Sequence, residues 1–180
     1  FTLVGATTQA GKLSGPMRDR FGLTQHLEFY SADDLAEIVT NAAKKLDISI
    51  EAQAAKLLGE RSRKTARVAL KLLKRCRDYA QIEGEGKITT KAVQEALIIL
   101  GVDDLGLDGS DRKLLKAIID KFHGGPVGLT TLAASTAEDV GTIEDVYEPF
   151  LMQVGLLART NRGRVVTAKT YEYFGLDQPS

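Results

Sequence analysis

Three arginines cluster in one short segment where two β-prone runs flank a turn. They are Arg159, Arg162 and Arg164. A guanidinium suits a phosphate because its fork of donors matches the phosphate oxygens and it stays protonated. Helical patterns precede this segment, and helices followed by a basic hairpin are typical of a winged helix, a small fold that usually binds duplex DNA. We therefore expect the hairpin to contact DNA. A solvated hairpin, or a winged helix that binds protein, is the alternative.

A second pair of arginines, Arg18 and Arg20, lies in a loop between a Gly-Pro turn and a Phe-Gly pair. One hypothesis is that an arginine here reaches a phosphate on a neighbouring subunit and stabilises charge during phosphoryl transfer. The other is an ordinary surface loop with one ion pair through Asp19. The residues alone slightly favour the surface loop.

A run of basic residues without a carboxylate extends from position 61 to position 77. Helix starts attract anions, so an arginine in a first helical turn, such as Arg67, could hold a nucleotide phosphate. Arg63 and Lys64 would add to the positive potential there. The simpler interpretation is a solvated helix face, which is the commoner outcome for a charge run.

Several chemical signatures are absent from the sequence. It contains no Gly-x-x-x-x-Gly-Lys-Ser/Thr loop and no acidic strand end to hold magnesium. His26 and His123 are far apart and have no ligand spacing to Cys76, so we do not expect a metal site. Cys76 is the single cysteine and is expected to be buried. By itself, this chain is not expected to hydrolyse nucleotide.

Three zones of the sequence must position these residues. Residues 1–30 alternate strand-like runs at 1–4 and 25–29 with a loop. Residues 31–105 have the apolar spacing of helices throughout, and residues 106–180 contain three helices and the hairpin. The pattern predicts a mostly α fold with small β parts, in which Ser110 caps a helix and Pro149 kinks another.

The third helix of the terminal unit is acidic. Glu144, Asp145 and Glu148 are expected on its exposed face. Because carboxylates repel the phosphate backbone, this helix is a poor candidate for insertion into the major groove. DNA contact should therefore be made by the hairpin and be largely independent of sequence.

The overall composition sets further limits. Basic and acidic residues balance at 24 each, so any attraction to nucleic acid must come from local patches. No apolar run is long enough to span a membrane and no signal peptide is visible, so a cytoplasmic location is expected. The sequence begins at Phe1 inside a strand-like run, and we expect part of a larger domain to precede it.

Five segments occur in an order and spacing that resemble the RuvB family, the bacterial AAA+ motors that drive branch migration of Holliday junctions. They are Gly5-Ala-Thr-Thr8, Met17-Arg-Asp-Arg-Phe-Gly22, Gly124-Gly-Pro-Val-Gly-Leu129, Thr142-Ile-Glu-Asp-Val146 and Arg159-Thr-Asn-Arg-Gly-Arg164. The resemblance implies the end of an AAA+ ATPase core over residues 1–30, a helical lid over 31–105 and a winged-helix DNA-binding domain over 106–180.

The resemblance also implies an activity. Family members are homohexameric, ATP-dependent DNA translocases of recombination and repair, which use ATP with Mg²⁺ and work with RuvA and RuvC on Holliday junctions. The Walker motifs and the RuvA-binding hairpin would lie upstream of this sequence. The alternative is a non-enzymatic winged-helix DNA-binding or adaptor module.

Individual roles follow from matching positions. Thr8 matches the residue that reports on the γ-phosphate, and Arg20 matches the arginine finger that reaches the ATP of the adjacent subunit. Tyr30 matches a tyrosine of the nucleotide pocket, and Arg67 matches the sensor arginine of the lid. The wing arginines match residues that contact DNA.

The sequence departs from the family pattern at two places. Lys64-Thr-Ala66 stands where the family usually has Gly-Thr-Pro, and Gln9 stands where an arginine is frequent. The first departure changes the backbone freedom of the helix start that aims Arg67.

Overall fold

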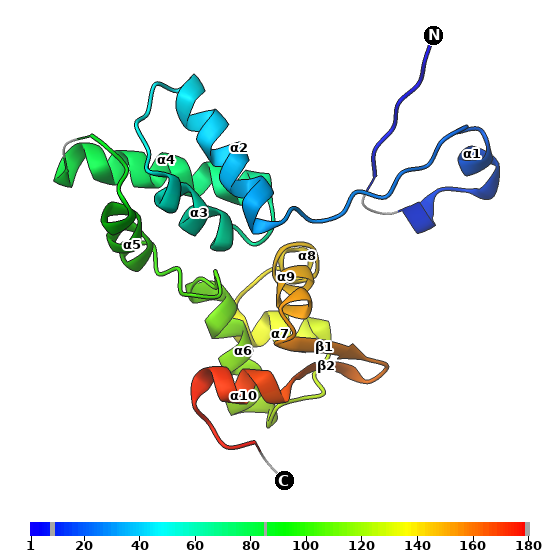
Figure 1. Cartoon of the computed structure of the whole chain (residues 1–180). Helices are drawn as coiled ribbons and strands as arrows, with labels where there is room; N and C mark the ends of the chain where they lie inside the picture. The colour runs from blue at the N-terminus through cyan, green and yellow to red at the C-terminus, as the bar shows by residue number, and fades with distance from the viewer. Residues whose placement is uncertain (8–9, 85, 179–180) are drawn as a thin grey trace.

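The structure is a computed structural model, which describes residues 1–7, 10–84 and 86–178. An N-terminal segment leads into a helical unit, and a winged-helix unit follows (Figure 1). The described chain is mostly helical and has one two-stranded sheet, so the predicted fold class is confirmed. No helix among the described residues is long and apolar enough to cross a membrane.

The N-terminal segment contains only short helices. They are the 3-10 turn η1 (Ala10–Lys12) and α1 (Gly15–Asp19). The strands expected at 1–4 and 25–29 do not form in the described residues. A strand requires a hydrogen-bonded neighbour, and neither run is paired with another described segment. The prediction from β-prone composition was therefore wrong for this chain, and most side chains of the segment are exposed.

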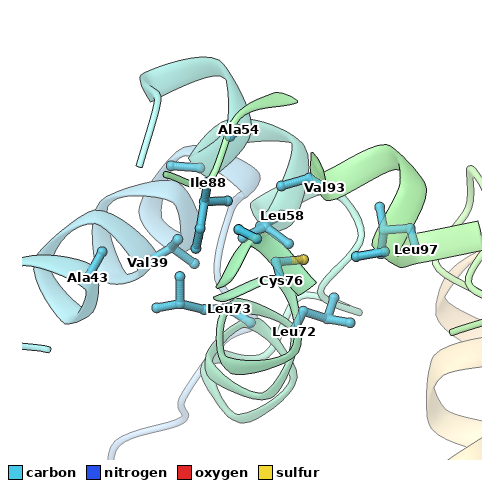
Figure 2. Close-up of a cluster of buried hydrophobic side chains, with 14 of the residues drawn as sticks. Val39, Ala43, Ala54, Leu58, Leu72, Leu73, Cys76, Ile88, Val93 and Leu97 are labelled. Atoms are coloured by element: carbon cyan, nitrogen blue, oxygen red, sulfur yellow. The ribbon is translucent and has the colours of Figure 1, made fainter. Parts of the chain in front are cut away.

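The helical unit packs four helices around one apolar core. They are α2 (Ala32–Lys45), α3 (Ala52–Glu60), α4 (Ala66–Glu83) and α5 (Thr90–Ile99). Ser31 and Asp34 form a capping box at the start of α2. Leu58, Leu73 and Cys76 are fully buried in the core, as Figure 2 shows, so Cys76 is packed as expected. Burial raises the pKa of its thiol to about 12, which keeps the sulfur protonated and unreactive.

The winged-helix unit has its own apolar core. Its helical elements are α6 (Gly109–Phe122), α7 (Leu129–Thr136), α8 (Val140–Thr142), the π-helix η2 (Ile143–Tyr147), α9 (Glu148–Gln153) and α10 (Ala168–Phe174). Asp108, and not Ser110, is the N-cap of α6, because its carboxylate accepts the amides of both Ser110 and Asp111. Pro149 lies in the first turn of α9, directly after the π-helical segment, so the hydrogen bonding of the third helix departs from the regular α-helical pattern just before the proline, where a kink is expected.

The predicted hairpin is formed by β1 (Leu157–Thr160) and β2 (Gly163–Val166). Arg159 is paired directly with Arg164 across the strands, which places both side chains on one face of the hairpin. Gly163 has a φ of 138°, and an ideal Cβ there would overlap the carbonyl of Val127. The glycine lets the turn approach the segment before α7, where Val127 and Arg164 exchange backbone hydrogen bonds.

Candidate nucleotide and DNA sites

Arg20 ends α1, and its backbone amide donates to Met17. Its side chain is exposed. Across residues 1–7, 10–84 and 86–178, neither Arg18 nor Arg20 forms an ion pair with Asp19, so nothing in the described chain supports the surface-pair alternative. Thr8 lies outside the described residues, and its predicted role stays a prediction.

A shallow pocket of about 700 Å³ lies beside Tyr30, whose ring is half exposed. The pocket is lined by residues 27–32, by Lys64 from the start of α4 and by Gln153 from α9. The structure thus brings the predicted pocket tyrosine to Lys64, which forms no ion pair within residues 1–7, 10–84 and 86–178. Arg67 and Arg20 do not line this pocket.

Arg67 lies in the first turn of α4, where its side chain is exposed. The hydroxyl of Thr65 caps this helix by accepting the amide of Val68 at 3.4 Å. The helix therefore starts normally although Ala66 replaces the usual proline. No ion pair of Arg67 occurs in the part of the chain that the structure describes. Its charge at a helix start is thus open to an anion.

The departure at position 64 has a visible backbone consequence. Arg63 and Lys64 have φ values of 50° and 53°, so two consecutive residues are left-handed. This conformation costs a non-glycine residue about 1–2 kcal/mol, and glycine avoids that cost. Neighbouring contacts must hold the turn in this chain.

We expected Arg63 to add to the positive potential at the start of α4, and this expectation is wrong. Its guanidinium turns to the winged-helix unit, where Nη2 donates to Asp111 and lies 2.8 Å from Asp108 Oδ2. Sequence reasoning missed this pair. The signal for it was an acidic cluster at Asp103, Asp104, Asp108 and Asp111, opposite in charge to the basic run at 61–77. Ion pairs between the acidic cluster and the basic run would neutralise charges on both segments.

The buried carboxyl of Asp111 is predicted to titrate unusually high. Loss of solvation raises its pKa to about 6, outweighing the Arg63 guanidinium, and its Oδ1 has no hydrogen-bond partner among the described residues. Because the folded-state pKa is raised, this group's contribution to the free energy of unfolding should be greatest below about pH 4 and be lost as pH rises through about 6. Carbon-13 NMR of the Asp111 carboxyl should give a midpoint near 6; a midpoint at or below 4 would contradict the prediction.

The wing arginines occupy different environments. Arg162 lies exposed in the turn, and Arg159 lies exposed on β1 with Nη1 3.4 Å from Glu144 Oε1. Arg164 is instead 7% exposed and binds Glu148 through two hydrogen bonds of 2.5 and 3.2 Å. This geometry supports a structural role for Arg164, and its predicted contact with DNA stays untested.

The expectation that all three carboxylates of the acidic helix are exposed was wrong for Glu148. Glu148 is 3% exposed and does not face solvent, because it neutralises Arg164 inside the unit. Glu144, one helical turn earlier in sequence, pairs with Arg159 at the surface. The carboxylates of this helix therefore hold the hairpin in place as well as lowering the helix's own suitability for a DNA groove.

Comparison with known proteins covers almost the whole chain. Residues 1–27 match the P-loop domain of the Holliday junction DNA helicase RuvB, residues 30–103 the RuvB AAA lid domain, and residues 104–175 the RuvB C-terminal winged helix domain. A solved mutant of Thermotoga maritima RuvB is 48% identical with a TM-score of 0.91, over 99% of this chain and 60% of that one.

A second Thermotoga maritima structure, described as the RuvB Holliday junction branch migration motor, is 46% identical with a TM-score of 0.87. The match covers 94% of this chain and 57% of that chain. The present chain thus spans about 60% of the length of such relatives. With RuvB-specific matches in all three segments and this identity over nearly every residue, the chain belongs to the RuvB family.

Proposed function

We propose that this chain serves as the lid and DNA-gripping part of a homohexameric, ATP-driven DNA translocase that migrates Holliday junctions. The observation that carries the proposal is the exposed basic tip of the hairpin, Arg159 and Arg162, on a winged-helix unit fastened to a RuvB-type lid. Residues 31–105 act as the lid and residues 106–180 as the DNA-binding domain. RuvA and RuvC are the partners that the family implies.

The nucleotide in this proposal is ATP, bound between subunits. Tyr30 borders its pocket, Arg67 meets its phosphates from the lid, and Arg20 reaches it from the adjacent subunit. Free cationic side chains at a helix start, with a half-exposed aromatic ring nearby, suit an anionic nucleotide. Thr8 senses the γ-phosphate. Within the described residues no group of three or more His, Cys, Asp or Glu side chains could hold a metal, so Mg²⁺ enters only as the family's companion of ATP.

The decisive experiment uses a protein that joins this chain to the rest of a RuvB-type ATPase core. ATP-dependent migration of a synthetic four-way junction, together with DNA-stimulated ATP turnover, supports the proposal. DNA binding without turnover would instead identify a non-enzymatic winged-helix or adaptor module.

Substitution of the exposed wing arginines should weaken DNA binding uniformly. We expect Arg159→Ala and Arg162→Ala each to lower the slope of log Kobs against log salt by about 0.9, as for one lost phosphate contact. Arg159 must exchange its Glu144 pair for the phosphate, which costs little because exposed pairs contribute about 0–1 kcal/mol. Salt-dependent anisotropy with several unrelated duplexes measures the slopes.

Arg75→Ala is the matched control, since Arg75 is an exposed arginine on α4 with only a surface pair to Asp78. It should leave the salt slope unchanged. A loss of affinity restricted to one DNA sequence would contradict backbone contact and indicate base reading.

A further inference from the structure

The left-handed turn before α4 is held from outside its own unit. Arg63 and Lys64 carry positive φ values, and Arg67 follows within one helical turn. Inside the helical unit, the backbone of Ser62 accepts from Thr65, and the Ser62 hydroxyl donates to Leu58. These bonds tie the flanking residues but do not reach the Arg63 side chain.

The Arg63 side chain is anchored entirely by the winged-helix unit and the linker before it. Nε donates to the Gly106 carbonyl at 3.2 Å, and Nη2 donates to the fully buried Asp111. The guanidinium also lies 5.0 Å from the centre of the Phe150 ring on α9. With 12% of the side chain exposed, Arg63 is nearly enclosed by these groups.

The two units approach closely at the same place. Gly106 has a φ of 81°, and an ideal Cβ there would lie 3.0 Å from the Arg61 carbonyl oxygen. Arg61 also binds Asp104 at 2.9 Å. The linker is itself fastened, because Asp103 accepts from Arg112 and from the Tyr173 hydroxyl of α10. The surface that contacts Arg63 is therefore held in place by hydrogen bonds to the winged-helix unit.

This surface is continuous with the wing. Phe150, which the guanidinium covers, lies on the same helix as Glu148, and Glu148 binds Arg164 of β2. An ordered set of contacts thus extends from the turn that carries Lys64 to the hairpin. Chains of packed and hydrogen-bonded side chains of this kind can carry energetic coupling between two sites.

From this arrangement we infer that Arg63 is a positioning residue for nucleotide sensing: through Asp111, the winged-helix unit holds the left-handed turn at Arg63 and Lys64 that aims Arg67. The inference rests on the proposed nucleotide role of Arg67. Without the anchor, the turn is free to leave its costly conformation, and the fraction of protein with Arg67 correctly aimed falls. Affinity for nucleotide falls by the same fraction.

The test measures the dissociation constant of a fluorescent non-hydrolysable ATP analogue at pH 7.5 in the full-length protein. Losing the anchor that offsets the strain of one left-handed residue, about one or two kcal/mol, should weaken binding by about 5- to 30-fold in Arg63→Ala. Arg67→Ala should weaken it by at least as much. In the double variant, Arg63→Ala should weaken binding by less than about twofold beyond Arg67→Ala alone. Positioning Arg67 has no effect on affinity once its guanidinium is absent.

Controls separate positioning from stability. Arg63→Lys keeps a positive charge facing Asp111 but loses the Nε bond to Gly106, so it should recover part of the lost affinity. If Arg63→Ala does not fold, Arg63→Gln, which removes the charge but keeps a long polar side chain, replaces it in the cycle. Arg75→Ala, on the exposed face of α4, should leave affinity unchanged. Thermal unfolding of each variant checks that the folded protein is being compared.

Each outcome has a distinct meaning. Losses that simply add in the double variant, or an unchanged affinity in Arg63→Ala beside a weakened Arg67→Ala, would overturn the inference. An unchanged affinity in Arg67→Ala would overturn both the inference and the proposed nucleotide role, and it would trace the failure to Arg67. Non-additive losses with recovery in Arg63→Lys support the inference.

Discussion

Replacing Arg20 by alanine, in a protein that joins this chain to the rest of a RuvB-type ATPase core, is expected to lower kcat for ATP hydrolysis by about 10³-fold or more. In the proposed hexamer, this exposed guanidinium at the end of α1 neutralises charge that develops on the phosphoryl group of the adjacent subunit. DNA affinity should change little, because the wing lies in a separate unit of the chain. Steady-state turnover and DNA anisotropy on the same preparation measure both effects.

A neighbouring arginine provides the control. Arg18 lies two residues earlier on α1, is also exposed, and should tolerate alanine with turnover largely retained. In mixed rings of wild-type and Arg20→Ala protein, turnover should follow the number of wild-type fingers, because each of these also completes the intact site of a neighbouring variant subunit. Unchanged turnover in Arg20→Ala would remove the finger role and favour the ordinary surface loop.

Breaking the buried ion pair between Arg164 of the hairpin and Glu148 of α9 should have the largest effect on the stability of the winged-helix unit. We expect Arg164→Ala to lower the free energy of unfolding of the winged-helix unit by about 3–5 kcal/mol, because it leaves the buried Glu148 carboxylate uncompensated. Urea unfolding at pH 7, followed by a probe in this unit, measures the change. The loss of DNA binding by this variant should match the fraction of the winged-helix unit that is unfolded.

The matched control is the other arginine on the same face of the hairpin. Arg159→Ala removes an exposed pair with Glu144 and should change stability by less than about 1 kcal/mol. The double variant Arg164→Ala/Glu148→Ala should be more stable than Arg164→Ala alone, since no buried charge is then left unpaired. A loss below about 1 kcal/mol in Arg164→Ala would contradict the buried pair and return Arg164 to the DNA-contacting set.

The different environments of Arg159 and Arg164 fit a hairpin that is held rigid by one arginine and offers the other for the proposed phosphate contact. The two residues are opposite each other in the register, yet one pairs at the surface and the other in the interior. Alternation along a strand assigns faces, but it does not say which part of a face a neighbouring helix covers. Here the acidic helix covers the position nearer the core.

Local signals in the sequence located most elements correctly. Ser31 and Thr89 each start a helix, because a side-chain oxygen that accepts an unpaired backbone amide acts within four residues of chain. Pro149 stands in the first turn of α9, directly after the π-helical segment, for an equally local reason, since its ring cannot donate a helical hydrogen bond. The prediction of Ser110 as a cap failed only because Asp108 competes for the same amides. The predicted strand at Phe1 does not form, because a strand depends on a neighbouring strand that the local sequence does not supply.

The sequence by itself therefore determined the helices, the basic hairpin and the family resemblance, all of which rest on short-range spacing and residue type. Only the tertiary structure decided which charges are free. Arg63 and Arg164 look no different from Arg67 and Arg159 in the sequence, but carboxylates from distant segments enclose the first two. Whether a guanidinium meets a buried carboxylate or an incoming phosphate depends on contacts between residues far apart in the chain, and spacing along the sequence does not encode those distances.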